Sequence, residues 1–149
     1  MKLLRVTALI FLFVSCNNPG NNNGKAAKTQ ADSLMGEVME GHNKGMAKMD
    51  KIDEEKKAIQ HVLDSISLLP TNLQKRSDQY KMQLDSAFNR LTFANEAMDK
   101  WMNEFNMDTL KDNEQEQVKY LQSEKLKITK VTDAMIISLQ KSDSLLKKK

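Results

Sequence analysis

The sequence predicts an all-α protein, an antiparallel up-down-up three-helix bundle formed by a helical hairpin and a third long helix. Three observations support this fold class. Apolar residues recur every three or four positions along three long segments, each segment opens with a helix-capping pattern, and only a few residues separate the segments. Such spacing is typical of amphipathic helices and differs from the strict alternation of a half-buried strand.

The first helix is expected over residues 29–68. It opens at Thr29-x-x-Asp32, where the hydroxyl and the carboxylate can each cap a backbone amide of the other residue. It ends before Pro70, because a proline disfavours helical angles in the preceding residue. Its predicted apolar face consists of Met35, Met39, His42, Met46, Met49, Ile52, Ile59, Leu63 and Ile66.

Three glycines lie in the first half of this helix, at Gly36, Gly41 and Gly45. A glycine inside a helix costs about 1 kcal/mol relative to alanine. The sequence therefore predicts that the helix frays or kinks near its start.

The second and third helices are expected over residues 71–106 and 109–147. Each begins with a threonine followed three residues later by an amide or acid, in the pairs Thr71-x-x-Gln74 and Thr109-x-x-Asp112. The predicted apolar faces are Leu73, Tyr80, Leu84, Ala87, Leu91, Ala94, Met98, Trp101, Met102 and Phe105, then Val118, Leu121, Ile128, Val131, Met135, Leu139 and Leu146. Short connections make consecutive helices antiparallel neighbours. The alternative is a two-helix coiled coil whose third helix packs on another subunit.

The N-terminal residues 1–28 are expected to lie outside the single helical domain, which covers residues 29–149. Lys2 and Arg5 precede the apolar run "ALIFLFV" at residues 8–14. This run is far shorter than the roughly 20 apolar residues that span a bilayer as a helix. It is typical of an export signal.

The sequence "FVSC" at residues 13–16 resembles the lipobox of bacterial lipoproteins, with Phe13 where that family prefers leucine. The resemblance implies removal of residues 1–15 as a signal peptide and acylation of Cys16, the only cysteine of the chain. The alternative is an ordinary secretory signal followed by a chance cysteine. Residues 16–28 would form the lipidated end and a flexible Asn/Gly-rich tether. Because Asn17 replaces the aspartate that signals inner-membrane retention, the resemblance implies an outer-membrane location facing the periplasm.

The charge balance argues against a nucleic-acid partner. Loss of Lys2 and Arg5 with the signal peptide reduces the 23 basic residues to 21, against 20 acidic residues, so the mature chain is nearly neutral. The chain has two histidines, no Gly-rich phosphate loop and no nucleophile with an evident base. We therefore predict that the protein is not an enzyme and needs no cofactor.

The stretch "MGEVMEGHNKGMAKM" at residues 35–49 holds four methionines and His42. Antiparallel pairing places His42 opposite Ala97, within about one turn, and therefore near "MDKWM" at residues 98–102. Methionine fills core gaps well, so packing is the simplest interpretation, and a Met-lined groove for a partner is another. Thioethers and imidazole also suit Cu(I) or Ag(I). The candidate ligands are Met39, His42, Met46, Met49, Met98 and Met102, with Trp101 as a cation–π neighbour.

This set of side chains resembles the His/Met/Trp ligands of periplasmic copper-efflux chaperones, although those proteins have a different fold. The stretches "EVMEGHNKGMAKM" and "AMDKWM" also resemble parts of the short helical lipoproteins of Gram-negative bacteria labelled "viral A-type inclusion protein". That resemblance implies a lipid-anchored helical protein and no particular activity. The expected function is a structural or protein-binding module of the cell envelope, acting on an envelope protein or a second copy. The alternative is a carrier of Cu(I) or Ag(I).

Overall fold

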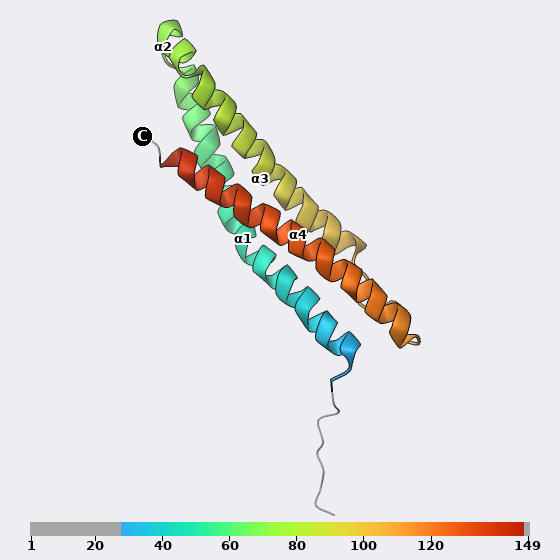
Figure 1. Cartoon of the computed structure of the whole chain (residues 1–149). Coiled ribbons are helices and arrows are strands. Elements are labelled where there is room, and N and C mark those ends of the chain that lie inside the picture. Colours follow the sequence, from blue (N-terminus) through green and yellow to red (C-terminus); the bar gives the residue numbers. More distant parts are fainter. Residues whose placement is uncertain (1–27, 148–149) are drawn as a thin grey trace, which may run out of the picture.

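The computed structural model describes residues 28–147. It contains α1 (Gln30–Ser67), α2 (Thr71–Arg76), α3 (Asp78–Glu104) and α4 (Glu114–Leu146), and no strand occurs in this part of the chain. The three long helices run up, down and up along one elongated bundle, in which each contacts the other two (Figure 1). The predicted fold class is therefore confirmed. Cys16 and the signal peptide expected at residues 1–15 lie outside the described residues.

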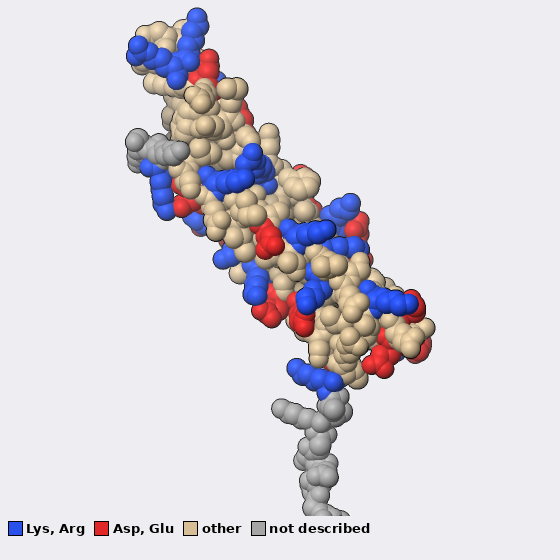
Figure 2. Space-filling model, viewed as in Figure 1, with Lys and Arg blue, Asp and Glu red and all other residues tan. Residues whose placement is uncertain are grey.

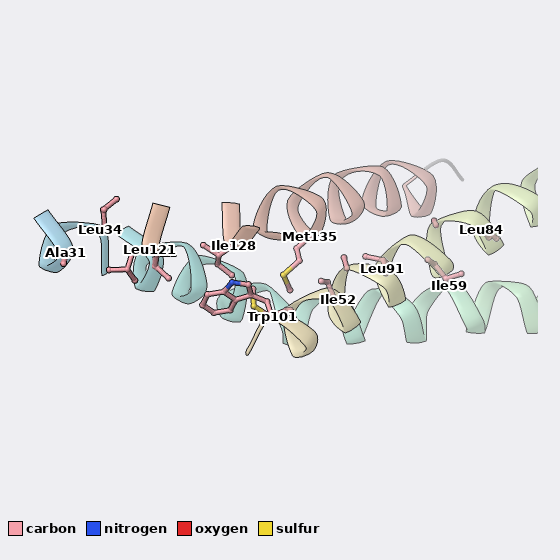
Figure 3. Packing of buried hydrophobic residues seen from close by; sticks show 14 of the residues in the cluster. Ala31, Leu34, Ile52, Ile59, Leu84, Leu91, Trp101, Leu121, Ile128 and Met135 are labelled. Carbon is pink, nitrogen blue, oxygen red and sulfur yellow. The ribbon is translucent and has the colours of Figure 1, made fainter. Parts of the chain in front are cut away.

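Buried positions repeat every seven residues along each long helix. They are Ala31, Val38, Gly45, Ile52, Ile59 and Ile66 in α1, Leu84, Leu91 and Met98 in α3, and Leu121, Ile128, Met135 and Ser142 in α4. A seven-residue repeat is the pattern of helices that pack with coiled-coil geometry. Figure 3 shows this core as a line of side chains between the three helices.

The buried face of α1 is displaced from the predicted methionine face. Leu34 and Val38 are buried, whereas Met35 and Met39 next to them are only partly so. The prediction was wrong here because Gly45 occupies a core position without contributing an apolar side chain. The methionines instead flank the core.

Two of the three glycines of α1, Gly41 and Gly45, allow a close approach of the neighbouring helices. A Cβ at Gly41 would lie 3.0 Å from Ile128 Cγ2, and one at Gly45 would overlap the end of the Met98 side chain. The Thr132 hydroxyl donates a hydrogen bond of 2.9 Å to the carbonyl oxygen of Gly41. α1 runs without interruption through all three glycines, so the predicted fraying does not occur.

The start of α1 is capped as predicted. The Asp32 amide donates to Thr29 Oγ1, and the Thr29 amide donates to Asp32 Oδ2, each over 3.0 Å. The hydrogen bond from the Thr29 amide holds the pKa of Asp32 below its usual value of 3.8.

The helix predicted over residues 71–106 is divided into α2 and α3 at Ser77, which is a correction to that prediction. The Ser77 hydroxyl donates to the Leu73 carbonyl oxygen over 3.0 Å, a local bond that competes with regular helix geometry. The predicted cap at Thr71 does not form, because Gln74 donates instead to the carbonyl oxygens of Ser67 and Leu69. Gln74 thereby provides hydrogen-bond donors to two carbonyl groups at the C-terminal end of α1.

The third long helix begins at Glu114 and not at the predicted residue 109. Its N-cap is Asn113, whose side chain accepts a hydrogen bond of 3.2 Å from the Glu116 amide. The prediction at Thr109 was wrong because the preceding residues form a turn-rich connection, in which Leu110 has a φ of 60°.

Candidate functional site

The predicted Met/His cluster lies where α1 and α3 run antiparallel. The His42 ring lies 5.7 Å from the Trp101 ring. About four turns further along α1, Lys56 Nζ lies 5.6 Å from the centre of the Phe88 ring. The observed partner of His42 is thus one turn beyond the predicted Ala97. The contact of Lys56 with Phe88 has nearly the same register, so the hairpin is centred about two residues later in the chain than the predicted pairing implies.

The structure separates the candidate metal ligands into two groups. Met98 and Trp101 are buried, and Met98 reaches toward Gly45 within the three-helix core. Met46 is 38% exposed, and the others are partly buried: Met39, His42, Met49 and Met102. The direct ring contact between His42 and Trp101 joins the two groups. Within residues 28–147, no cluster of three or more His, Cys, Asp or Glu side chains could hold a metal.

His42 lacks a carboxylate partner among the described residues. Its Nδ1 lies 3.2 Å from Asn43 Oδ1, the side chain of its sequence neighbour. The nearby Glu40 is paired with Lys44 over 2.6 Å, and the Lys44 contact lowers the pKa of Glu40. The imidazole is therefore held by packing against Trp101 more than by polar contacts.

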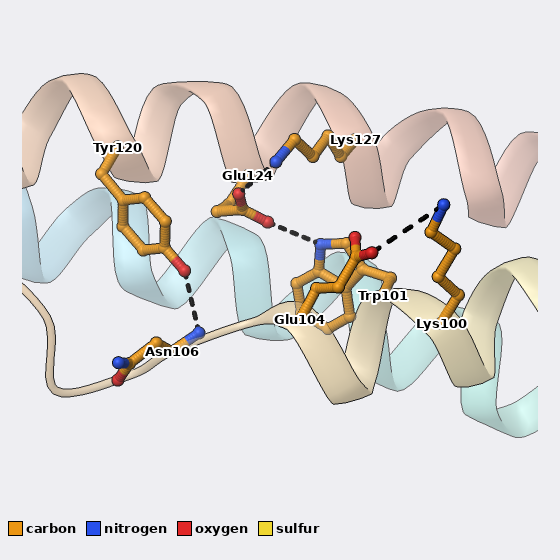
Figure 4. A network of polar contacts seen from close by, with 7 residues as sticks. All are labelled: Lys100, Trp101, Glu104, Asn106, Tyr120, Glu124 and Lys127. Atoms are coloured by element: carbon orange, nitrogen blue, oxygen red, sulfur yellow. Dashed lines mark hydrogen bonds and ion pairs between the residues drawn. The ribbon is translucent and has the colours of Figure 1, made fainter.

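Trp101 is fixed by a buried polar contact with α4. Its Nε1–H donates to Glu124 Oε2 over 2.9 Å, and Glu124 Oε1 accepts from Lys127 Nζ over 2.7 Å (Figure 4). Glu124 is 4% exposed, and its hydrogen bond raises the pKa of Lys127 above 10.5. The sequence analysis missed Glu124 because a charged residue gives no apolar signal. Glu124 lies seven residues from both Gln117 and Val131, and this seven-residue spacing is the signal that could have revealed it.

Aromatic rings extend this cluster toward the connection between α3 and α4. Phe105 stacks on Trp101 with ring centres 4.7 Å apart, and Tyr120 lies 6.2 Å from Phe105. The Tyr120 hydroxyl accepts a hydrogen bond of 2.8 Å from the Asn106 amide. These contacts line up three aromatic rings at the end of the bundle that holds His42 and the methionines, which we call the Met/His end.

A groove between α3 and α4 is a second candidate site, and no sequence signal pointed to it. It has a volume of about 620 Å³, and its lining includes the small residues Ser86, Ala134 and Ser138. Phe93 and Ile137 line it and are 68% and 48% exposed. Two large apolar side chains on neighbouring helices thus remain accessible beside small residues.

The groove continues along the same two helices as a second depression of about 400 Å³. Both depressions share Ser86 and Arg90, and the second adds Lys141. Figure 2, which views the bundle with α4 in front, shows Lys and Arg side chains spaced along its length, with Asp and Glu side chains and uncharged surface between them.

Comparison with known proteins identified no relative: no family model matches the chain, and no curated protein or solved structure matches it. None of the helices within residues 28–147 is both long enough and apolar enough to cross a membrane.

Proposed function

We propose that this protein is a lipid-anchored helical module of the cell envelope that binds another protein through the side of the bundle formed by α3 and α4. It is attached to the outer membrane through acylated Cys16 and faces the periplasm. The tether at residues 17–28 spans at most about 40 Å when extended, so it keeps the bundle close to the membrane while leaving its sides accessible.

The groove between α3 and α4 is the observation that carries the protein-binding role. The core of the bundle is complete without Phe93 and Ile137, since the seven-residue repeat supplies buried residues from all three long helices. These two exposed side chains therefore do not contribute to folding as core residues do. Apolar side chains gathered in a groove mark interaction sites more often than apolar residues scattered singly over a surface.

Two measurements test this function. Wild-type protein should incorporate labelled palmitate, and the Cys16→Ala variant should not. A photo-crosslinking amino acid at Ile137 should give an adduct of discrete size in intact cells. The same group at Leu126, which is 64% exposed on α4 and lines neither depression, is the control and should give none. Absence of palmitate from the wild type would refute the anchor, and equal adducts at both positions would refute the binding site.

A second candidate function is the binding of Cu(I) or Ag(I), and the contact of His42 with Trp101 is the observation that favours it. A cation bound at His42 would lie near the Trp101 ring, between α1 and α3. The nearby thioethers on these two helices are those of Met39, Met46, Met49 and Met102. Soft cations favour such ligands.

Titration of Cu(I) under reducing conditions, followed by Trp101 fluorescence, tests this second function. Quenching should weaken in His42→Leu and Met46→Leu. The buried Met98→Leu variant then shows whether the core thioether takes part. Equal quenching in wild type, His42→Leu and Met46→Leu would exclude a metal site between α1 and α3.

A further inference from the structure

The α3–α4 groove carries charge of one sign. Arg90 and Lys141 line it, both are exposed, and no carboxylate lines either depression. Neither cation forms an ion pair with another residue of the described chain. The groove therefore offers unneutralised positive charge next to exposed apolar side chains.

The depression between α1 and α4 provides an internal comparison. It is lined by residues of both signs, and both of its cations are already paired: Lys44 pairs with Glu40, and Lys125 pairs with Glu37. A third carboxylate, that of Asp133, lines it as well. Cations that are already paired offer little attraction to an external anionic group. The distinction between the two grooves is thus one of available charge and not of shape alone.

We propose that the α3–α4 groove binds an acidic amphipathic helix of a partner protein. This inference rests on the protein-binding function proposed above and specifies the partner's chemistry. The apolar side of the helix covers Phe93 and Ile137, and carboxylates along its edges pair with Arg90 and Lys141. Two antiparallel helices form a groove that a third helix can enter with its apolar stripe, and apolar contacts spaced along one helix face are the usual basis of such recognition.

A second copy of this chain fits the groove less well than an acidic partner. Symmetric dimers place the same surface patch on both sides of the interface. Pairing through this groove would bring Arg90 and Lys141 of one copy toward the same cations of the other, with no carboxylate in the groove to neutralise them. Like charges placed together at an interface are unfavourable and suppress such pairing.

The test uses the full chain reconstituted in phosphatidylcholine vesicles, which carry no net charge. The probe is a fluorescent synthetic helix of four heptads with leucines along one side and glutamates at both edges. A second peptide has lysines in place of all the glutamates. Fluorescence anisotropy at low salt should show that the glutamate peptide binds about tenfold or more tightly than the lysine peptide, and the difference should shrink at high salt.

Charge reversal in the groove should invert this preference. The double variant R90E/K141E is expected to lose about tenfold in affinity for the glutamate peptide and to gain affinity for the lysine peptide. Its matched control, K57E/R76E, changes two exposed cations outside the groove and should bind as wild type does. Ile137→Ser should weaken binding of both peptides, whereas Leu126→Ser should affect neither. All these side chains are exposed, so the bundle should remain folded, which circular dichroism verifies.

Several results would overturn the inference. Equal affinity for both peptides, or no effect of R90E/K141E, would show that charge does not select the partner. Sedimentation of the full chain as a dimer that Ile137→Ser dissociates would show that a second copy occupies the groove. If the glutamate peptide fails to bind while the Ile137 crosslink still gives a discrete adduct, the acidic-helix inference fails and the protein-binding function stands. If the crosslink also fails, both are refuted.

Discussion

At the scale of single residues, Trp101 is the side chain on which the Met/His end of the bundle depends. It contacts His42 of α1, stacks on Phe105, and donates its indole hydrogen to the buried carboxylate of Glu124. A buried charge is tolerated only when its polar neighbours compensate the lost hydration. Trp101 and Lys127 supply those neighbours to Glu124. One side chain thus links all three long helices.

Removal of this indole donor should destabilise the bundle. We expect Trp101→Phe to lower the free energy of unfolding by about 1–3 kcal/mol, because the carboxylate of Glu124 loses a hydrogen bond and remains buried. Glu124→Gln should cost less, since its amide oxygen still accepts from the indole. Chemical denaturation followed by circular dichroism gives these values, with the exposed Glu116→Gln as a control.

The double variant Trp101→Phe/Glu124→Leu separates the hydrogen bond from simple packing. If the two groups form a pair, replacing both by apolar side chains should cost less than the sum of the single changes. Strictly additive losses would contradict the coupling of Trp101 with Glu124.

Residue identity explains which parts of the core and the site the sequence could predict. All six buried residues of α3 were predicted, because apolar side chains fill its core positions: Leu84, Ala87, Leu91, Ala94, Met98 and Trp101. In α1 the predicted apolar face followed the methionines and missed the buried face. Gly45 and Glu55 occupy core positions there and give no apolar signal. The approach of His42 to Trp101 was predicted to within one turn. Glu124 was not, because its burial depends on partners from distant parts of the sequence.

At the scale of the helices, the glycines of α1 illustrate a conflict between local preference and packing. A Cβ added at Gly36 would have no heavy atom of another helix within 4 Å. A Cβ added at Gly45 would overlap the end of Met98 and lie 3.2 Å from Thr132 Oγ1 and 3.4 Å from Met135 Sδ. The same residue type therefore has different roles nine positions apart. At Gly36 it only weakens the helix, and at Gly45 it makes room for neighbouring helices.

Alanine substitution should therefore have opposite effects at the two positions. Gly36→Ala should stabilise the protein by about 0.5–1 kcal/mol, through helix propensity alone. At Gly45 the added methyl group displaces Met98 within a packed core, and overpacking of about 1–3 kcal/mol should exceed the same propensity gain. Thermal unfolding of both variants under one set of conditions measures the difference. Stabilisation by Gly45→Ala as large as that by Gly36→Ala would show that the close approach of the helices is not required.

The ends of the helices show why capping patterns were only partly predictive. The pattern at Thr29 forms the predicted box, in which Thr29 and Asp32 bond to each other's amides. At Thr71 the equivalent Gln74 turns back to the end of α1, and the start of α4 moves to Asn113. A contact from outside the pattern, the Tyr120 hydroxyl on the Asn106 amide, holds the preceding connection. Such long-range contacts cannot be read from a four-residue pattern.

At the scale of the whole molecule, the core extends without interruption between the Met/His end and the end at which α4 stops. Ala31 and Leu121 lie near one end of this core, and Ile59 and Leu84 lie toward the other (Figure 3). The tip that carries α2 extends beyond the end of α4 (Figure 1). Because neither end has a separate core, the three long helices depend on the same set of contacts. Unfolding of one end should therefore remove support from the other.

Leu91→Ala tests whether the bundle unfolds as a single unit. Leu91 is fully buried in the middle of α3, and its truncation should cost about 2–5 kcal/mol. Met82→Ala, an exposed position on the same helix, should change stability by less than about 0.5 kcal/mol. For a fragment of residues 25–149, far-UV circular dichroism reports all the helices, and Trp101 fluorescence reports only the Met/His end. In a cooperative bundle both signals shift to the same lower denaturant midpoint in Leu91→Ala. Separate midpoints would mean that the two ends fold independently, and the Met/His end would then be a unit whose ligands could bind or leave without affecting the α3–α4 groove.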